Sequence, residues 1–330
     1  MPTKTLAAML NSPTNPMYPV ANVDHLLERM SLTGFQGRKL GESYLLWKEM
    51  IETSGVKIIL GISGALIPAG MQECLIQVVE HGYVDAIVST GANIFHDICE
   101  HLGVKHYKGT HLINDEDLYR NGIDRIYDVF AVEKEFQKVE HYLGDFGASL
   151  GDVRLSSRAF LKHLGEKIID ERPDGRSLLA SCTKYNIPVY VPALADSSIG
   201  IGLVIAYRNG AKLVIDQISD ASELATFVEN AEKTGVIYLG GGIPKNFIQQ
   251  TEVIPPRKME RYIGGHAYAI QYTTDAPHWG GLSGCTFEEA VSWGKELPNA
   301  KKLQCFCDVT IALPLIVSGF IAANVVRKKD

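Results

Sequence analysis

Short apolar runs that end in small residues and lead into helical stretches recur along this chain, and they constrain its fold strongly. The first run covers residues 56–62, the second covers 83–89, and helical stretches follow them at 68–81 and 93–102. Strands that are apolar throughout and alternate with helices are typical of a parallel sheet that is covered on both faces. The pattern therefore predicts an α/β fold.

The same unit recurs in the C-terminal half of the chain. Further strand-like runs cover 187–194, 211–218, 236–239, 266–272 and 303–306. About seven strands with interleaved helices predict one doubly wound, mostly parallel sheet with helices on both faces. Ahead of the first strand we expect helices at 23–30 and 42–54, separated by a glycine-containing loop at 31–41.

The length of 330 residues could hold two domains, but no linker divides the chain. We therefore expect a proline-rich N-terminal arm at 1–20, followed by a single domain at 21–330. Within this domain, residues 115–155 are polar and helical in pattern, with interspersed aromatic residues. They predict a helical insertion or cap over the sheet.

The net charge of −6 limits the classes of partner. It argues against nucleic acid, because phosphate binding needs clustered Lys and Arg, and it is compatible with a cationic substrate. The apolar run at 311–325 contains Pro314 and Gly319 and is shorter than a bilayer span, so it predicts a buried terminal helix and no membrane contact. Residues 1–19 lack the pattern of a secretory signal, which favours a cytoplasmic protein.

The six cysteines are scattered through the chain, which fits reduced thiols in a cytosolic enzyme. Cys305 and Cys307 are two apart on a strand-like segment, which would point both to one face of a sheet. Core packing explains them better than metal binding, since no second cysteine pair accompanies them.

Small residues follow several of the predicted strands. They form the tripeptides at 63–65, 90–92, 195–197 and 240–242. Ligands of parallel sheets bind beyond the carboxyl ends of the strands, and small residues let a backbone approach a phosphate or a nicotinamide closely. Four such clusters together favour a dinucleotide over simple tight turns, although no GxGxxG pattern follows the first strand.

The stretch Glu289 to Lys295, with glycines at 280, 281 and 284 before it, contains the best catalytic candidate. A lysine directly after Trp293 and Gly294 could place an amine in an apolar slot that faces a cationic ligand. The alternative is structural: Gly294 ends a helix, and Lys295 interacts favourably with the helix dipole.

Five histidines lie close together in the sequence, at His81, His96, His101, His106 and His111. A metal-dependent hydrolase would use such imidazoles as ligands. The spacing of His96, Glu100 and His101 matches neither HExxH nor HxxEH. We therefore expect a partly exposed helix face and no metal.

Six motifs give the chain a family resemblance from about residue 18 to its C-terminus. They are TGFQGRKLG at 33–41, SGALIPAG at 63–70, VSTGANIFHD at 88–97, IPVYVPALADSSIG at 187–200, GGGIPKNF at 240–247 and EEAVSWGK at 288–295. In combination they resemble the deoxyhypusine synthase family. The resemblance implies a Rossmann-like fold and a homotetramer with active sites at subunit interfaces.

The resemblance also implies a reaction. Members of the family use NAD to oxidise spermidine, transfer the aminobutyl group to an active-site lysine as an imine, and pass it to an acceptor amine. The acceptor is a lysine of a translation initiation factor, or free putrescine in the related homospermidine synthases.

Site residues follow from the same resemblance. Lys295 matches the imine-forming lysine, which must be deprotonated to attack, and a pocket walled by Trp293 near a cationic nicotinamide would favour the neutral amine. The polyamine-binding candidates are Glu289, Trp293, Ser283, Asn246, His96, Gly281 and Leu282. The NAD-binding candidates are Gly64, Ala65, Leu66, Thr90, Gly91, Ala92, Asp196, Gly241, Thr274, Asp275, Asp308 and Val309.

Several positions depart from the eukaryotic pattern of the family. Asn246 stands in place of a histidine, Phe95 and His96 in place of two acids, and Ile201 and Leu282 in place of single acids. Fewer carboxylates imply a different polyamine, a different binding register or a free small amine as acceptor. A protein that binds NAD or a polyamine without catalysis is a further alternative.

Overall fold

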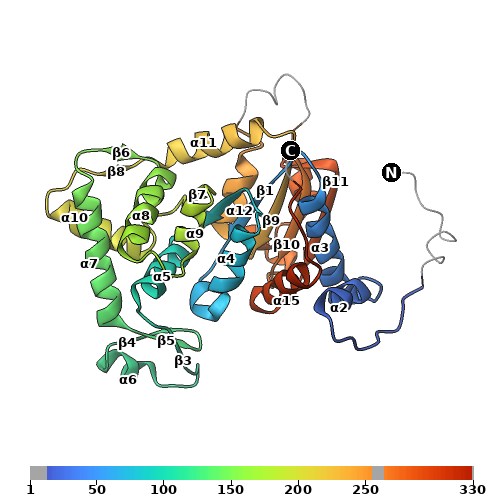
Figure 1. Ribbon diagram of the computed structural model, residues 1–330, viewed down its shortest axis with the longest axis horizontal. Coiled ribbons are helices and arrows are strands. Elements are labelled where there is room, and N and C mark those ends of the chain that lie inside the picture. Colours follow the sequence, from blue (N-terminus) through green and yellow to red (C-terminus); the bar gives the residue numbers. More distant parts are fainter. Residues whose placement is uncertain (1–12, 255–263, 329–330) are drawn as a thin grey trace.

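The computed structural model describes residues 13–254 and 264–328. Six parallel strands form a central sheet in the order β11-β10-β9-β1-β2-β7 (Figure 1). The strands are β1 (Val56–Ile62), β2 (Ala86–Ser89), β7 (Val189–Tyr190), β9 (Lys233–Leu239), β10 (His266–Tyr272) and β11 (Glu296–Cys305). The predicted α/β class with a mostly parallel sheet is confirmed.

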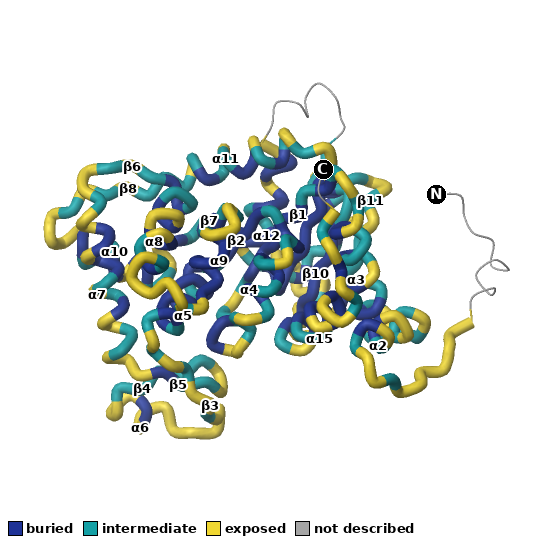
Figure 2. Tube along the Cα trace, in the orientation of Figure 1, coloured by how far each residue is buried: buried dark blue, intermediate teal, exposed yellow. Residues whose placement is uncertain are grey.

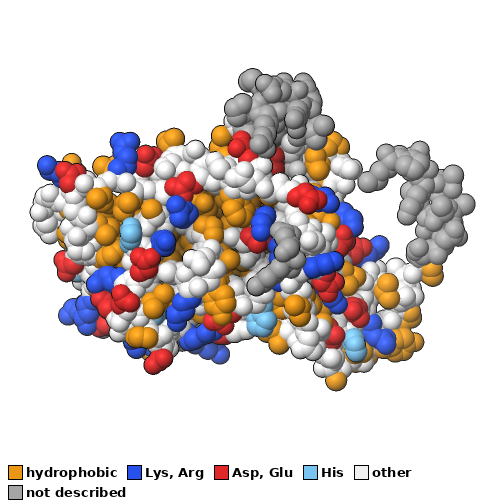
Figure 3. Space-filling view, turned by 45° about the horizontal axis from the view of Figure 1, so that its top comes forward, with side chains coloured by type: hydrophobic (Ala, Val, Ile, Leu, Met, Phe, Trp, Pro, Cys, Tyr) orange, Lys and Arg blue, Asp and Glu red, His pale blue; other side chains and the backbone are white. Residues whose placement is uncertain are grey.

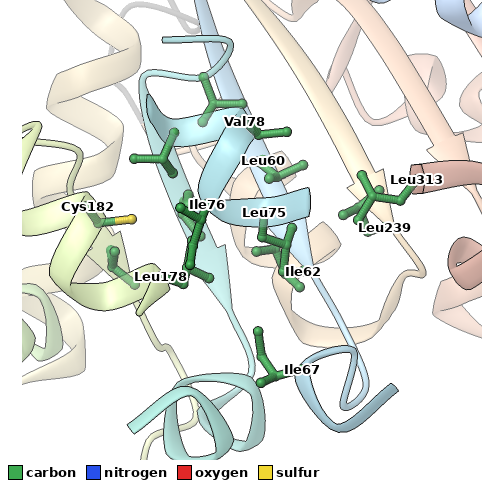
Figure 4. Packing of buried hydrophobic residues seen from close by; sticks show 14 of the residues in the cluster. Leu60, Ile62, Ile67, Leu75, Ile76, Val78, Leu178, Cys182, Leu239 and Leu313 are labelled. Carbon is green, nitrogen blue, oxygen red and sulfur yellow. The ribbon is translucent and has the colours of Figure 1, made fainter. Parts of the chain in front are cut away.

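Helices cover both faces of this sheet. Successive side chains of a strand point to opposite faces, so strands that are apolar throughout need a covering layer on each face. Leu60 and Ile62 of β1 pack with α4 on one face, as Figure 4 shows, whereas Ile59 packs on the other face. The first face is covered by α3 (Phe35–Glu52), α4 (Gln72–Glu80), α5 (Gly91–Leu102), α9 (Leu178–Lys184) and α15 (Val309–Ala322). The second is covered by α11 (Gln217–Glu229), α12 (Gly242–Gln250) and α14 (Phe287–Ser292).

The remaining elements extend this core at its two ends. At one end α2 (Val23–Met30) packs on α3 and α15; at the other lie α7 (Glu133–Ser149), α8 (Ser157–Glu171) and α10 (Ser198–Arg208) (Figure 1). A small antiparallel sheet of β3 (Tyr107–Lys108), β5 (Val129–Val132) and β4 (Ile123–Ile126) lies beside α6 (Asp115–Arg120). Short helical turns cover Ile67–Met71, Pro277–Trp279 and Leu282–Gly284.

Two local predictions were wrong, and a third was correct only in part. The run at 211–218 does not join the main sheet: only Val214–Ile215 forms a strand, β8, and it pairs with β6 (Arg154–Leu155). The expected loop at 31–41 is helical from Phe35 onward. The segment 115–155 contains α6 and α7, as expected, but also the strands β4 and β5 between them.

Burial follows the layers (Figure 2). The predicted terminal helix is α15, and its inward side chains are buried. No helix in the described part of the chain is long and apolar enough to cross a membrane. All six cysteines are free; Cys305 is buried on β11, whereas Cys307 lies beyond the end of that strand.

The expected arm falls partly outside the described residues, which begin at position 13; residues 13–19 are exposed and form neither helix nor strand. On the face shown in Figure 3, acidic and basic side chains are interspersed. The division into an arm and a single domain at 21–330 stays a prediction.

Candidate active site

The end of α14 fixes the backbone of Lys295. Gly294 adopts a left-handed φ of 68° directly after the helix, and its N–H donates to the Val291 carbonyl at 2.9 Å. The Lys295 N–H donates to the Ala290 carbonyl at 3.0 Å. These two bonds together form the glycine-terminated Schellman cap. Gly294 therefore does end a helix, and β11 begins at the residue after Lys295.

The side chain of Lys295 reaches across to α12. Its Nζ donates to Asn246 Oδ1 at 3.0 Å and lies 5.7 Å from the centre of the Trp293 ring. Lys295 is half-buried, whereas Trp293 is 65% exposed. The amine thus lies between the second turn of α12 and the end of α14, with one polar partner and one aromatic wall.

The loop 280–285 contacts the beginning of α12. The Gly242 N–H donates to Ser283 Oγ at 3.0 Å. A Cβ on Gly241 would lie 2.5 Å from the Ser283 Cα, so only glycine permits this approach. Gly281 and Leu282 are exposed on the same loop, and Glu289 is exposed on the first turn of α14. The structure therefore gathers the polyamine candidates around α12 and α14, with the exception of His96.

Several turns at the carboxyl ends of the strands interlock. Thr90 Oγ1 donates to the Gly64 carbonyl at 2.8 Å, and Asn93 Nδ2 donates to the same oxygen at 3.1 Å. The Leu66 N–H in turn donates to Asn93 Oδ1 at 2.7 Å. A Cβ on Gly91 would lie 2.3 Å from Ser197 Oγ. These contacts bring together the candidates at 64–66 and 90–92.

A cavity of about 780 Å³ opens beside these turns. Its wall includes Ala65, Leu66, Lys108, Tyr127 and Asp308. It therefore lies between the turn after β1, the small antiparallel sheet and the first turn of α15. This places two backbone candidates and one acidic candidate around a space large enough for half of a dinucleotide.

The acidic candidate of this cavity is the N-cap of α15. Asp308 Oδ1 accepts from the Thr310 N–H at 2.8 Å and from Thr310 Oγ1 at 2.5 Å, and Val309 after it is buried. Asp196, Thr274 and Asp275 do not line the cavity; all three are exposed on carboxyl-end loops, and the Asp275 N–H donates to Thr273 Oγ1 at 3.1 Å.

His96 belongs to a partly buried chain of hydrogen bonds. Its Nδ1 lies 2.9 Å from His106 Nε2, and His106 Nδ1 lies 2.6 Å from Glu100 Oε1. Burial, together with the neighbouring His106, lowers the pKa of His96 to about 3, so this ring is neutral near pH 7. His96 therefore cannot supply the negative charge that an acid supplies at this position in the eukaryotic pattern.

The predicted partly exposed face holds for part of the histidine group only: His81 and His111 are exposed, and His106 is partly buried. His96 and His101 are buried, because α5 packs against α7, α9 and α10. No group of three or more His, Cys, Asp or Glu side chains suited to a metal ion occurs among residues 13–254 and 264–328.

Two buried ionisable groups next to the site were not predicted. Lys245 is fully buried on α12, and burial lowers its pKa to about 8. Glu296 is fully buried at the start of β11; burial raises its pKa to about 7, although its Oε1 accepts from Gln249 Nε2 at 2.9 Å. One feature of the sequence could have indicated buried polar groups here: Gln271, whose Oε1 accepts from Lys245, interrupts the apolar run at 266–272.

Comparison with known proteins gives one consistent family. A family model described as deoxyhypusine synthase matches residues 25–320. A relative from Methanosarcina acetivorans named "Probable deoxyhypusine synthase 2" is 53% identical over 308 residues, which cover 93% of this chain and 89% of that protein. A relative of the same name from Archaeoglobus fulgidus is 49% identical over 293 residues, covering 88% and 96%.

Among solved structures, a crystal structure of a candidate deoxyhypusine synthase from Entamoeba histolytica superposes with a TM-score of 0.67 at 18% identity. The match covers 95% of this chain and 99% of that chain. At this identity the likeness shows a common fold.

Proposed function

This chain belongs to the deoxyhypusine synthase family of transferases, and from that premise we propose that it transfers an aminobutyl group from spermidine, or a related polyamine, through an imine on Lys295 to an acceptor amine. The observation that supports this most directly is the position of the Lys295 amine. It is half-buried, held by Asn246 at 3.0 Å and bounded by Trp293. Nucleophilic attack on a carbon–nitrogen double bond requires an amine that is held in position, in surroundings that are partly apolar.

In this proposal the residues of the chain have distinct roles. Lys295 in its neutral form attacks the oxidised carbon of spermidine, and the departing amine takes up protons to leave as 1,3-diaminopropane. Asn246 orients the attacking nitrogen, since its Oδ1 accepts from that nitrogen. Glu289 offers a carboxylate to a terminal ammonium, and Trp293 offers a cation-binding ring face.

The second half of the proposed reaction releases the lysine. The acceptor amine attacks the imine carbon of the Lys295 adduct, and the bond to Lys295 breaks, so the lysine recovers its amine. The new imine is then reduced to a secondary amine. NAD, when bound, would accept the hydride in the oxidation of spermidine and return it in this final reduction.

The proposed NAD-binding residues fit this cofactor at two points. The turns at 64–66 and 90–92 meet at the carboxyl ends of β1 and β2, where Thr90 donates to the Gly64 carbonyl and the Leu66 N–H donates to Asn93, and ligands of parallel sheets bind at this edge. Asp308, at the wall of the cavity of about 780 Å³, has a carboxylate that could accept from ribose hydroxyls. The chain would hold the dinucleotide across the carboxyl ends of the strands.

A free diamine is the second candidate acceptor, and one observation favours it. Compared with the eukaryotic pattern, Ile201 and Leu282 stand in place of acids, and His96, which lies apart from the candidates around α12 and α14, is neutral. A site with fewer carboxylates holds fewer ammonium groups, which suits a small acceptor as well as a protein lysine.

Trapping with borohydride tests the lysine imine. The chain is incubated with NAD and labelled spermidine and then reduced. We expect label on Lys295 and none in Lys295→Ala. Lys301→Ala is the matched control, since Lys301 is an exposed lysine on β11, the strand that follows Lys295, and pairs with Glu49. Equal labelling of Lys295→Ala would refute the covalent role.

A product assay separates the acceptors. With putrescine as the only added acceptor, formation of homospermidine would support the small-amine acceptor. Release of 1,3-diaminopropane that requires a translation initiation factor, with label on that protein, would support the protein acceptor. Neither product, with intact NAD and spermidine binding, would favour a binding protein without catalysis.

A further inference from the structure

The proposed reaction leaves a buried titratable group beside the site without a role. Lys245 lies on α12 directly before Asn246 and is fully buried. Lysine is rarely buried completely, because its ammonium loses hydration. Among the described residues it forms no ion pair with a carboxylate, and its hydrogen-bond acceptors are neutral oxygens. A side chain used only for packing would not need this charge.

The amine of Lys245 holds the far end of the loop 280–285. Its Nζ donates to the Cys285 carbonyl at 2.7 Å and to Gln271 Oε1 at 2.9 Å, and lies 5.7 Å from the centre of the Phe287 ring. Gln304 Nε2 donates to the same two oxygens, at 3.1 and 2.8 Å. The Cys285 carbonyl is therefore held by side chains from α12 and β11.

Gln271 extends the network to the neighbouring turn. Its Nε2 donates to the Ser283 carbonyl at 2.7 Å and to the Gly240 carbonyl at 2.8 Å. With two bonds accepted by its oxygen and two donated by its nitrogen, the amide uses its full bonding capacity. The side-chain amide of Gln271 thus connects the loop 280–285 and the turn 240–242 to the buried amine of Lys245.

We propose that Lys245 is a positioning residue, whose ammonium fixes the loop 280–285 against the turn 240–242 and so sets the distance between the loop and Lys295. This inference rests on the proposed transfer at Lys295 and adds a residue to it. An apolar side chain of similar length would fill the space, but the Cys285 carbonyl and Gln271 Oε1 would each lose a donor.

The charge of Lys245 gives the proposal a pH dependence. Burial lowers its pKa to about 8; Cys285, Glu296 and Glu289 favour the charged form, and Lys295 disfavours it. Hydrogen bonds from a charged donor are roughly twice as strong as neutral ones. The loop should therefore be held more firmly below pH 8 than above it.

Hydrogen exchange of the loop amides tests this without reference to activity. Lys245→Met is compared with the unmodified chain at pH 7 and pH 9, with Lys233→Met, an exposed lysine on β9, as control. At pH 7 we expect hydrogen exchange of the amides in 280–285 to be at least about tenfold faster in Lys245→Met. A hydrogen bond from a charged donor contributes about 1.5–3 kcal/mol, which corresponds to a factor of about 10 to 100 in the exchange rate. The ratio should shrink at pH 9.

Two further variants keep the test decisive. Lys245→Arg, which keeps a charged donor, should restore part of the protection. If Lys245→Met does not fold, Gln304→Leu, which removes the second donor to the Cys285 carbonyl, should give a smaller acceleration confined to the same loop. Unchanged loop exchange in a folded Lys245→Met, or the same ratio at both pH values, would overturn the proposal.

Kinetics connect the loop to the proposed reaction. Lys245→Met should raise KM for spermidine about tenfold, because the loop carries the polyamine candidates Ser283, Gly281 and Leu282. The loss of NAD affinity should be smaller, since Gly241 is the NAD candidate that contacts this loop and the turns at 64–66 and 90–92 are held by other bonds. Failure of the unmodified chain to form the trapped Lys295 adduct would refute the proposed function alone. The exchange experiment would still decide whether Lys245 holds the loop.

Discussion

At the scale of single residues, Asn246 is the partner that sets the direction of the Lys295 amine. We predict that Asn246→Ala slows imine formation by up to about tenfold, because a hydrogen bond between neutral groups contributes about 0.5–1.5 kcal/mol and about 1.4 kcal/mol corresponds to a tenfold change in rate. Single-turnover trapping with borohydride measures this rate. Gln250→Ala, an exposed change later on α12, is the control. A rate equal to that of the unmodified chain would mean that Asn246 does not orient the nucleophile.

Glu296 gives a prediction on stability against pH. Burial raises its pKa from 4.5 to about 7, so the folded chain holds this proton at pH values where the unfolded chain has released it. Stability is therefore lost as pH rises from about 4.5 to about 7, by up to about 3 kcal/mol. Glu296→Gln, which cannot ionise, should lack this loss.

Urea unfolding of both forms at pH 5 and pH 8 measures the effect of Glu296. The variant should gain stability relative to the unmodified chain at pH 8 and not at pH 5. Glu288→Gln, at an exposed carboxylate on α14, should show no such difference between the two pH values. An equal difference for both variants would assign the effect to net charge rather than to burial.

At the scale of elements, the turn between α14 and β11 holds the candidate nucleophile. Gly294 adopts φ 68°, a region that costs an L-residue about 1–2 kcal/mol. We predict that Gly294→Ala lowers the free energy of unfolding by about this amount and slows trapping at Lys295, since the same turn bonds the Lys295 N–H. Denaturant unfolding and single-turnover trapping are the two measurements.

Gly37→Ala is the matched comparison for the turn. Gly37 lies inside α3, and its nearest neighbour would be 3.6 Å from an added Cβ. An alanine there should be neutral or stabilise the chain by up to about 1 kcal/mol, because glycine weakens a helix interior. If Gly37→Ala and Gly294→Ala lowered the free energy of unfolding equally, the left-handed φ of Gly294 would not be the cause of the loss.

The elements that the sequence predicted well are those with long, buried apolar runs. The strands at 56–62 and 266–272 were predicted with their observed bounds, since most residues of both strands are buried and most are apolar. The run at 211–218 failed because only two of its residues form a strand, and their partner, β6, is distant in sequence. Apolar pattern alone cannot say which strand a run will pair with.

The loop predicted at 31–41 failed for a different reason. Its glycines suggested a flexible segment, yet Gly41 is helical and lets α2 approach α3: a Cβ there would lie 2.4 Å from the Leu27 carbonyl. In the site, the family motifs named Lys295 and its neighbours as candidates but did not name Lys245. The role that we propose for Lys245 depends on Gln271 and Gln304, which lie on two strands that come together only in the folded chain.

At the scale of the whole molecule, the surroundings of Lys295 are open in a single chain. Trp293 is 65% exposed, Trp279 is 77% exposed and Leu282 is 39% exposed. Large exposed apolar side chains beside a candidate active site are typical of a surface that a partner covers. This agrees with the expectation of a homotetramer whose active sites lie at subunit interfaces.

We predict that four chains of 36.2 kDa assemble, and that assembly and activity are lost together on dilution. Light scattering measures the mass. The tryptophan emission should shift to longer wavelength as the assembly dissociates, because Trp279 and Trp293 become exposed while the third tryptophan, Trp47, stays buried in the core. Replacing Trp279 with Phe should reduce that shift without abolishing it. A monomeric chain with full trapping activity would refute the assembly, and Lys295 would then have to react in a site open to water.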